Sequence, residues 1–244
     1  MDCQKTFSCE DCSAKNASLF AGLSPDELQR INACRSIRHF EKRARIFAQG
    51  EAALGVHCVH RGKLRLFHVS ESGREQTLRL ITEGGVVGTE ALLTEKSYSV
   101  SAETLESAEV CFLEKKAFLE LLEDSPSLAR RLLQTLAKEV QIQEETISAF
   151  ARKSVRERVA QTLLALNERF GKQSQIGSRL HIPLKRAEIA TLSGTVLESA
   201  VRCLSDFRND GFIHQIGRDI YIVSVEKLRA VADGRPASAL PRQA

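Results

Sequence analysis

The sequence predicts an α+β protein with an N-terminal antiparallel β-roll or jelly-roll barrel, a long helix and a C-terminal winged helix-turn-helix. Three observations support this fold class. Four glycines recur every eleven or twelve residues between positions 36 and 111 and separate short alternating strands, which is typical of an antiparallel barrel. Residues 127–150 contain neither Gly nor Pro and show helical apolar spacing. Residues 185–222 fit two short helices around Gly194 followed by a hairpin.

The composition limits the class of protein before any motif is considered. The chain has 244 residues, enough for two modest domains, and 43% of them are hydrophobic. No apolar run approaches the ~20 residues of a membrane span, and the start of the chain lacks the apolar core of a signal peptide. Seven cysteines, an odd number, do not fit a secreted disulfide framework. We therefore expect a cytoplasmic protein with no membrane partner, whose cysteines are reduced thiols or metal ligands.

The first half of the chain divides into a short cysteine-rich segment and a β-roll domain. Residues 1–18 form the segment. A helix should begin at Pro25, because Ser24 is a good N-cap and Glu27 completes a capping box. Residues 19–116 are expected to form the β-roll, and barrels of this kind commonly enclose a small ligand.

Residues 117–150 are expected to contain a short helix and then a long helix that pairs with a second copy of itself. The apolar residues of the long helix alternate in steps of three and four, as in a coiled coil. Gln143 is the polar member of this stripe and a candidate for fixing the register. The predicted dimer interface consists of Leu133, Leu136, Val140, Gln143, Ile147 and Phe150.

Residues 151–230 form the predicted DNA-binding domain, and residues 231–244 a flexible tail. A hinge at 151–154 leads into a helix over 155–170. Gly194 suits the left-handed turn between the two short helices that follow. In the second of these helices, Ala200, Cys203, Leu204 and Phe207 share the apolar face. The candidate DNA contacts on the outward face and at the start of the motif are Lys185, Glu198, Ser199, Val201, Arg202 and Ser205.

The outward face of the second helix has two interpretations. Glu198 and Arg202 either form an i,i+4 ion pair worth ~0.2–0.5 kcal/mol, or they read guanine and cytosine edges in the major groove. The hairpin over 211–222 favours base reading, because it completes a winged helix. The charge distribution agrees, since residues 151–244 hold 16 Lys/Arg and 9 Asp/Glu, a net +7, against −3 for residues 1–150.

The order of barrel, long helix and winged helix resembles the Crp/Fnr superfamily of bacterial transcription regulators over nearly the whole chain. The most telling residues are Gly73-Arg74-Glu75-Gln76 with Leu80, Gly84 and Gly88; Lys153 to Ala160; Gly194 with Glu198, Val201, Arg202 and Phe207; and Gly211-Phe212-Ile213.

The resemblance implies a homodimer that binds double-stranded DNA and works with RNA polymerase. Its two recognition helices would enter successive major grooves of a palindrome, with half-sites ~34 Å apart. Glu198 and Arg202 occupy the family's base-reading positions, and Ser199 a phosphate-contact position. Leu197 and Val201 depart from the patterns of the two best-known branches, and Val196 is a poor N-cap. These departures leave the operator sequence open.

Three interpretations of the sensed signal stay open, and the first is a cyclic nucleotide. Family members bind one through a Gly-Glu pair and a later Arg-Ser pair. No arginine lies between Arg79 and Arg130, and a buried cyclic phosphate without a cation is costly. Standard cyclic-AMP binding is therefore not expected, although a different nucleotide stays open. The candidate effector-binding residues are Gly88, Thr89, Glu90 and Ser99.

The second interpretation is an iron–sulfur cluster. Oxygen-sensing relatives hold one with three N-terminal cysteines and one at the end of the barrel. By this resemblance Cys9 and Cys12 form a C-x-x-C pair and Cys111 is the barrel ligand, whereas Ser18 stands near the third N-terminal position. Cys3 is the candidate for the fourth thiolate, since such clusters usually need four.

The third interpretation has no bound ligand, and the signal is then thiol oxidation of the C-x-x-C pair or an unknown molecule. The other cysteines, Cys34, Cys58 and Cys203, are interpreted as core residues, because cysteine is among the most buried residue types.

Two functions of other classes compete with the regulator. A cupin-like metal-dependent enzyme would need histidines and carboxylates that project into the barrel, but His57 and His60 are three apart and should point to opposite faces of a strand. A sensory or scaffold protein that no longer reads DNA would not need Glu198, Arg202 and the basic charge. The sequence contains no nucleophile elbow or P-loop, and we expect no enzymatic activity.

Overall fold

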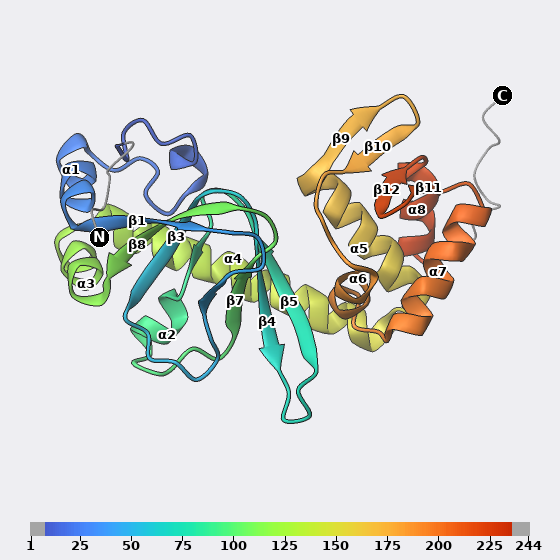
Figure 1. The fold of residues 1–244 in the computed structure, drawn as a ribbon, viewed down its shortest axis with the longest axis horizontal. Coiled ribbons are helices and arrows are strands. Elements are labelled where there is room, and N and C mark those ends of the chain that lie inside the picture. The colour runs from blue at the N-terminus through green and yellow to red at the C-terminus, as the bar shows by residue number, and fades with distance from the viewer. Residues whose placement is uncertain (1–7, 236–244) are drawn as a thin grey trace. The chain divides into compact units, whose positions relative to one another are not determined.

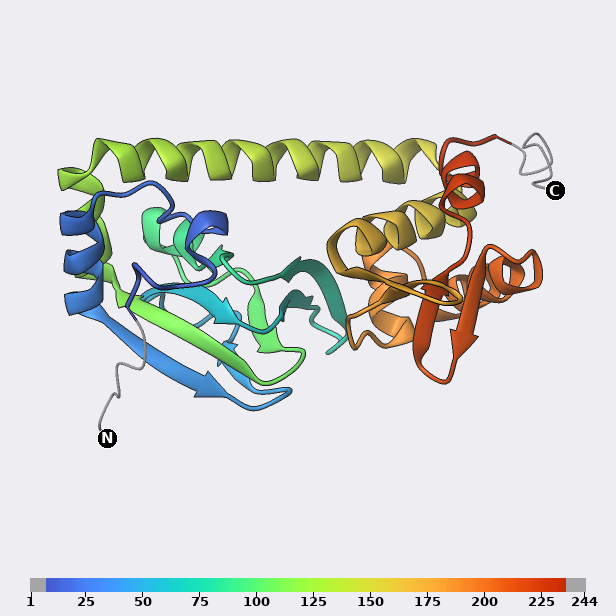
Figure 2. The same cartoon turned by 90° about the horizontal axis from the view of Figure 1, so that it is seen from above.

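The computed structural model describes residues 8–235 and divides the chain into two compact units, Met1–Gln141 and Ile142–Ala244. The boundary between the units falls inside the long helix α4 (Pro126–Arg152), which is coloured yellow-green in Figures 1 and 2. The N-terminal unit is a β-roll with short helices, and the C-terminal unit is a helix-turn-helix with a small antiparallel sheet. The predicted α+β fold class is confirmed.

The β-roll consists of two four-stranded antiparallel sheets. Their strand orders are β1-β8-β3-β6 and β2-β7-β4-β5. The elements before α4 are η1 (Lys15–Ala17), α1 (Pro25–Cys34), β1 (Arg35–Phe40), β2 (Arg45–Phe47), β3 (Gly55–Arg61), β4 (Leu64–Val69), β5 (Glu75–Ile81), β6 (Val86–Val87), α2 (Thr89–Leu93), β7 (Ser101–Thr104), β8 (Ala108–Glu114) and α3 (Lys115–Asp124).

Strands β3 and β8 bury side chains on both faces of their sheet. Val59 and Val110 belong to the core between the two sheets. Val56 and Leu113 belong to a second core, which they share with residues of the N-terminal segment, α1, α3 and α4. Because side chains alternate along a strand, Cys58 and Cys111 face this second core and not the inside of the roll. Residues 9–23 therefore cover part of the outer face of the sheet.

The start of α1 agrees with the sequence prediction. The helix begins at Pro25, the hydroxyl of Ser24 accepts from the backbone N–H of Glu27, and the Glu27 carboxylate accepts from the backbone N–H of Ser24 at 2.7 Å. The same box satisfies two donors that would otherwise lack intrahelical partners. Glu27 also accepts a hydrogen bond from Ser125, and Arg30 pairs with Asp124 at 2.6 Å, so α1 is held against the junction of α3 and α4.

The C-terminal unit has the predicted winged helix-turn-helix, with one hairpin that the sequence analysis missed. Its sheet has the order β11-β12-β10-β9, in which the missed hairpin β9–β10 extends the wing. The elements are α5 (Val155–Phe170), β9 (Gly171–Ser174), β10 (Gly177–Leu180), α6 (Arg186–Leu192), α7 (Leu197–Asn209), β11 (Ile213–Ile216), β12 (Asp219–Ile222) and α8 (Val225–Ala232).

The end of the chain differs in one respect from the expectation of a tail over 231–244. Val231 and Ala232 are buried in the last turn of α8, so the helix continues into the predicted tail. Residues 236–244 lie outside the described part of the chain. Within residues 8–235, none of the helices combines the length and the apolar character that crossing a membrane requires.

Candidate functional site

The turn between α6 and α7 is fixed by a side chain from a different helix. Arg158 of α5 donates to the carbonyl oxygens of Ser193 at 2.9 Å and Gly194 at 3.0 Å, and also to that of Lys153 at 2.6 Å. One guanidinium therefore joins the start of α5 to the turn of the helix-turn-helix, using the fork of donors that only Arg offers. The sequence analysis included Arg158 only as part of a family motif and did not predict this role.

Helix α7 presents the face that the sequence predicted. Its buried residues are Ala200, Cys203, Leu204 and Phe207. Arg156 of α5 pairs with Asp210 at 2.8 Å and Asp206 at 3.5 Å, and its guanidinium lies 4.7 Å from the ring centroid of Phe207. The orientation of α7 within the unit is therefore set by both apolar packing and ion pairs.

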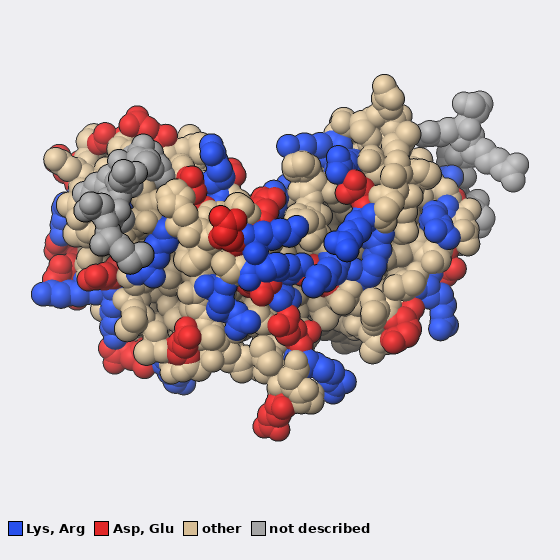
Figure 3. Space-filling view, in the orientation of Figure 1, with Lys and Arg blue, Asp and Glu red and all other residues tan. Residues whose placement is uncertain are grey.

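The candidate DNA contacts lie on the solvent-facing side of α6 and α7. Lys185, Glu198, Val201 and Arg202 are exposed, and Ser199 and Ser205 are half-buried. Within the described residues, Glu198 and Arg202 form no ion pair or hydrogen bond with another side chain, so the i,i+4 pair of the first interpretation is not made. Figure 3 shows Lys and Arg side chains gathered on the visible face of the C-terminal unit. Both helix side chains are free to meet an external partner.

The N-terminus of α7 departs from the usual arrangement. Val196 is the N-cap residue, has extended backbone, and provides no side-chain hydrogen bond to the helix. The first amides of α7 are therefore left for solvent or for a ligand. An anionic group is the favoured partner at such a helix start.

The predicted dimer stripe on α4 is mostly exposed in the single chain. The exposed fraction is 68% for Leu133, 53% for Val140 and 68% for Ile147. Gln143 is also exposed, whereas Leu136 is half-buried against the second core of the N-terminal unit. Phe150 is 41% exposed, but its ring also lies against Gly194 of the same chain. Within residues 8–235, the stripe thus leaves the apolar side chains of Leu133, Val140 and Ile147 largely uncovered.

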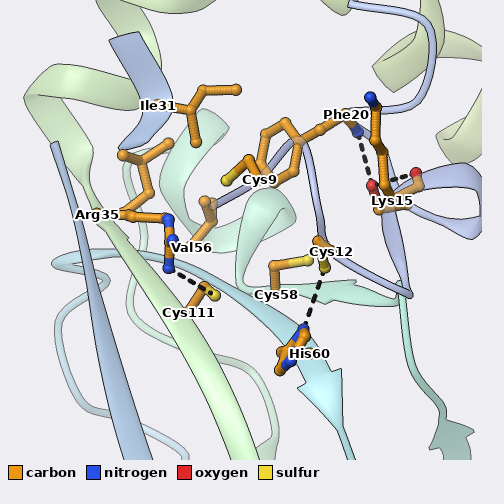
Figure 4. Close-up of a pocket in the computed structure, with 12 residues that line it drawn as sticks. Cys9, Cys12, Lys15, Phe20, Ile31, Arg35, Val56, Cys58, His60 and Cys111 are labelled. Carbon is orange, nitrogen blue, oxygen red and sulfur yellow. Dashed lines mark hydrogen bonds between the residues drawn. The ribbon is translucent and has the colours of Figure 1, made fainter. Parts of the chain in front are cut away.

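Four cysteines from three segments line one pocket on the outer face of the sheet. Cys9 and Cys12 come from the N-terminal segment, Cys58 from β3 and Cys111 from β8. Figure 4 shows their side chains around a common space, with Arg35 next to Cys111 and His60 next to Cys12. The sequence analysis predicted three of these cysteines as ligands and assigned Cys58 to the core. Cys3, its fourth candidate, lies outside the described residues.

Basic and polar groups surround the thiols. The guanidinium of Arg35 lies 3.6 Å from Sγ of Cys111, and Nδ1 of His60 lies 3.1 Å from Sγ of Cys12. The other ring nitrogen of His60 faces the Glu109 carboxylate at 3.6 Å. Because Arg35 is only 5% exposed, its positive charge acts on the pocket with little screening by water.

Burial raises the pKa of three of the pocket thiols, those of Cys9, Cys58 and Cys111. It raises the pKa of Cys111 to about 11, against the opposing effect of Arg35. It also raises the pKa of Cys58 well above its ordinary value, and the nearby thiols of Cys111, Cys12 and Cys9 add to that shift. The pKa of Cys9 is raised for the same main reason. A raised pKa makes these three thiols poor nucleophiles, and a metal that bound them would displace their protons.

The other cysteines are placed differently. Cys203 is buried in α7, as predicted, whereas Cys34 is exposed at the end of α1 and is not the core residue that was expected. Among residues 8–235, no group of three or more His, Cys, Asp and Glu side chains is arranged to hold a metal ion. The pocket thus supplies sulfur donors around a space and not a closed site for one ion.

The predicted effector residues lie at the start of α2 and beyond its end. Gly88 has φ +92° and caps α2, Thr89 is buried, and Glu90 and Ser99 are exposed. A β-carbon at Gly88 would lie 3.1 Å from the ring of Tyr98. The pKa of Tyr98 is raised by burial and by nearby carboxylates, so its hydroxyl stays neutral.

A separate open pocket of about 510 Å³ lies at one end of the roll. Tyr98 lines it, but the four predicted effector residues do not.

On the helix side of the roll, Arg79 of β5 binds the carboxylate of Glu139 in α4 through two hydrogen bonds of 3.0 and 2.5 Å. This guanidinium is therefore engaged within the chain.

Two family models match the chain. The cyclic nucleotide-binding domain matches residues 37–125, and the Crp-like helix-turn-helix domain matches residues 157–231. Together they cover the β-roll and the winged helix. The chain is 27% identical over 228 residues to the transcriptional activator protein Anr of Pseudomonas aeruginosa, with 93% of each chain covered. The match to the transcriptional activator protein FnrA of Stutzerimonas stutzeri is 27% over 232 residues, with 95% of each chain covered.

Solved structures give the same fold. The structure of FixK2 from Bradyrhizobium japonicum superposes with a TM-score of 0.71 at 24% identity, covering 81% of this chain and 96% of that one. The matched relatives regulate transcription and are not enzymes, which removes the cupin-like alternative. Both domain models and relatives along nearly the whole length agree, and the chain belongs to the Crp/Fnr family of DNA-binding transcription regulators, with an N-terminal sensory domain.

Proposed function

We propose that two copies of the chain bind a palindromic operator, with α7 of each copy in the major groove. The observation that carries this proposal is the free outward pair of Glu198 and Arg202 on a helix that is otherwise fixed by its own domain. Arg202 is suited to donate two hydrogen bonds to a guanine, and Glu198 to accept one from a cytosine. Ser199, Ser205 and Lys185 flank them as phosphate contacts, and Val201 adds an apolar contact to a base edge.

Dimerisation through α4 is the second part of the proposal. The exposed apolar residues Leu133, Val140 and Ile147 recur along one stripe of the helix, where a second copy would cover them. Leu136, Gln143 and Phe150 complete the stripe. A palindromic site and a two-fold dimer match each other geometrically. RNA polymerase is the further partner that a regulator of this family would contact.

The experiment that tests operator binding is a titration of the purified full chain against duplexes selected from a random library. We expect a palindromic consensus with half-sites about one helical turn, ~34 Å, apart. Affinity should fall steeply as salt rises, because phosphate contacts release counterions. Selection of a single half-site by a monomer, or selection of no sequence, would contradict the proposal.

We also propose that the chain senses its signal through an iron–sulfur cluster bound at the cysteine pocket. The donor set supports it, since Cys9, Cys12 and Cys111 face one space with Arg35 and His60 beside them. Thiolate sulfur is the usual ligand of such clusters, and the buried Arg35 offsets the negative charge that thiolates bring. When bound, the cluster would supply a redox-sensitive bond between the N-terminal segment and the sheet.

Anaerobic purification tests the cluster directly. We expect a brown protein with iron and acid-labile sulfide in equal amounts, and a loss of both after exposure to air. A colourless, iron-free protein prepared without air would exclude the cluster. Mass spectrometry of the same sample would then distinguish a Cys9–Cys12 disulfide from a bound small molecule, which are the other two interpretations of the signal.

A further inference from the structure

We propose that Cys58 of β3 is the fourth thiolate ligand at the cysteine pocket. This inference rests on the proposed cluster and assigns its ligand set as Cys9, Cys12, Cys58 and Cys111. From the sequence, Cys58 is expected to be a core residue. It is distant in sequence from Cys9 and Cys12, which supply the other ligand pair.

The strand register brings Cys58 to the pocket. Cys58 and Cys111 are direct cross-strand partners in the antiparallel pair β3–β8. Directly opposed residues have their side chains on the same face, with Cβ atoms ~4.5–5.5 Å apart. Any group that is bound by Cys111 on this face therefore comes within reach of Cys58. Both residues are half-buried, and neither forms a disulfide.

Ser18, near which relatives have a third N-terminal cysteine, supplies no sulfur, and its hydroxyl is already engaged. Ser18 lines the same pocket, but its hydroxyl donates to the carbonyl oxygen of Lys15 at 2.8 Å and accepts from the backbone N–H of Phe20 at 3.1 Å. With only 6% of its surface exposed, Ser18 stabilises the turn that follows η1. The thiol missing from this position is present across the pocket, on β3.

The other candidate donor at the pocket is occupied. Both ring nitrogens of His60 have polar neighbours, Nδ1 next to Cys12 and Nε2 next to Glu109. We therefore assign His60 a positioning role toward Cys12. Arg35 faces Cys111 and supplies positive charge beside its sulfur atom. Cluster binding needs thiolates, and Arg35 would offset part of their negative charge.

The test compares five forms of the full chain, all purified without air. They are the wild type, Cys58→Ser, Cys111→Ser, Cys3→Ser and Cys34→Ser. The readouts are iron and sulfide per chain and the electron paramagnetic resonance spectrum after reduction. We expect Cys58→Ser and Cys111→Ser to lose iron by at least about tenfold, since even losing a supporting partner of a ligand costs that much. Cys3→Ser and the exposed-site control Cys34→Ser should keep the wild-type iron content and spectrum.

A rescue variant separates ligation from folding. Adding Ser18→Cys to Cys58→Ser returns a fourth thiol to the same pocket, and we expect it to restore most of the iron. Circular dichroism of the metal-free proteins checks that each variant folds, and Cys58→Ala replaces Cys58→Ser if the serine variant does not. Wild-type iron content in Cys58→Ser, or loss of iron in Cys3→Ser, would overturn the assignment of Cys58. A wild type that is itself free of iron and sulfide would instead overturn the cluster.

Discussion

The ring of Phe150, near the end of α4, lies directly against Gly194 in the turn of the helix-turn-helix. A β-carbon at Gly194 would lie 2.6 Å from Cε1 and 2.7 Å from Cζ of that ring. Gly194 also has φ +60°, which side chains rarely adopt. The turn therefore needs glycine for two separate reasons, backbone conformation and close approach. The last part of α4 and the DNA-reading motif are in this way packed as one body.

Replacing Gly194 by alanine should destabilise the C-terminal unit more than the backbone alone explains. The left-handed conformation costs about 1–3 kcal/mol, and the contact with Phe150 adds to it. Gly211→Ala is the matched control, because Gly211 has φ +72° but no atom within 4 Å of its β-carbon position. Urea unfolding should show a larger loss in the free energy of unfolding for Gly194→Ala than for Gly211→Ala. Introducing Phe150→Leu as well should reduce the difference between the two alanine variants. Equal losses in the two alanine variants would contradict the packing argument.

Replacing Arg202 by alanine should relax selectivity at one base pair of each half-site. Loss of a bidentate contact to guanine costs about 1–3 kcal/mol, which a titration with the consensus duplex and its single-base variants would measure. Arg208→Ala is the control, since Arg208 is also exposed but lies in the last turn of α7. It should weaken binding to all duplexes alike, if at all. Unchanged base preference in Arg202→Ala would disprove the assigned contact.

A charge in the middle of the α4 stripe should separate the dimer. Val140→Glu places a carboxylate where two apolar surfaces are proposed to meet, and burying an unpaired charge is costly. Sedimentation should show a monomer and a large loss of operator affinity. Gln134→Glu makes the same change in charge at an exposed position of α4 outside the stripe, and it should remain a dimer. A Val140→Glu protein that sediments as a dimer would exclude this interface.

His57 should make the stability of the N-terminal unit depend on pH. Burial, assisted by the charge of Arg38, lowers its pKa to about 4 from the ordinary 6.5. The imidazole lies between the rings of Phe47 and Phe112, and its Nδ1 has no hydrogen-bond partner among the described residues. Above pH 6.5 the ring is neutral in both the folded and unfolded chain. Between pH 6.5 and 4 only the unfolded chain takes up the proton, so stability falls as the pH falls.

Through His57, the free energy of unfolding should be about 3 kcal/mol lower below pH 4 than above pH 6.5. Urea unfolding at pH 7, 5.5 and 4.5 would measure it, with His57→Phe as the comparison. The variant should lose less stability over this range than the wild type, because the carboxylates and His60 titrate in both proteins. Parallel pH profiles would show that His57 is not the buried neutral group described here.

Local sequence signals located the elements well where they depend on neighbouring residues. The capping box at Ser24 identified the start of α1, and the helix over 155–170 was predicted at the bounds of α5. The hairpin β9–β10 was missed because its strands, such as Gly171–Ser174, are polar and short and show no apolar alternation. Strand pairing supplies their stability, and no local pattern reports it.

The sequence was less informative wherever a residue has a choice of partner. Steps of three and four on α4 identify one face of the helix but do not say what covers it, so Phe150 was assigned to a second copy although it also packs on Gly194. Cys58 was assigned to the core because cysteine is among the most buried residue types. Residue type does not report strand pairing, and the pairing of β3 with β8 places Cys58 next to Cys111.

The cysteine pocket and the start of α4, the proposed dimer helix, adjoin one apolar cluster. Leu19 and Phe20, which follow the C-x-x-C segment, pack in the same apolar cluster as Leu128 and Leu132 in the first turns of α4. Releasing the C-x-x-C segment from the sheet would weaken the packing of Leu19 and Phe20 against the first turns of α4. If the pocket senses the signal and α4 pairs two copies, as proposed, a change at the cysteines would reach α4 through this one apolar cluster and not through the inside of the barrel.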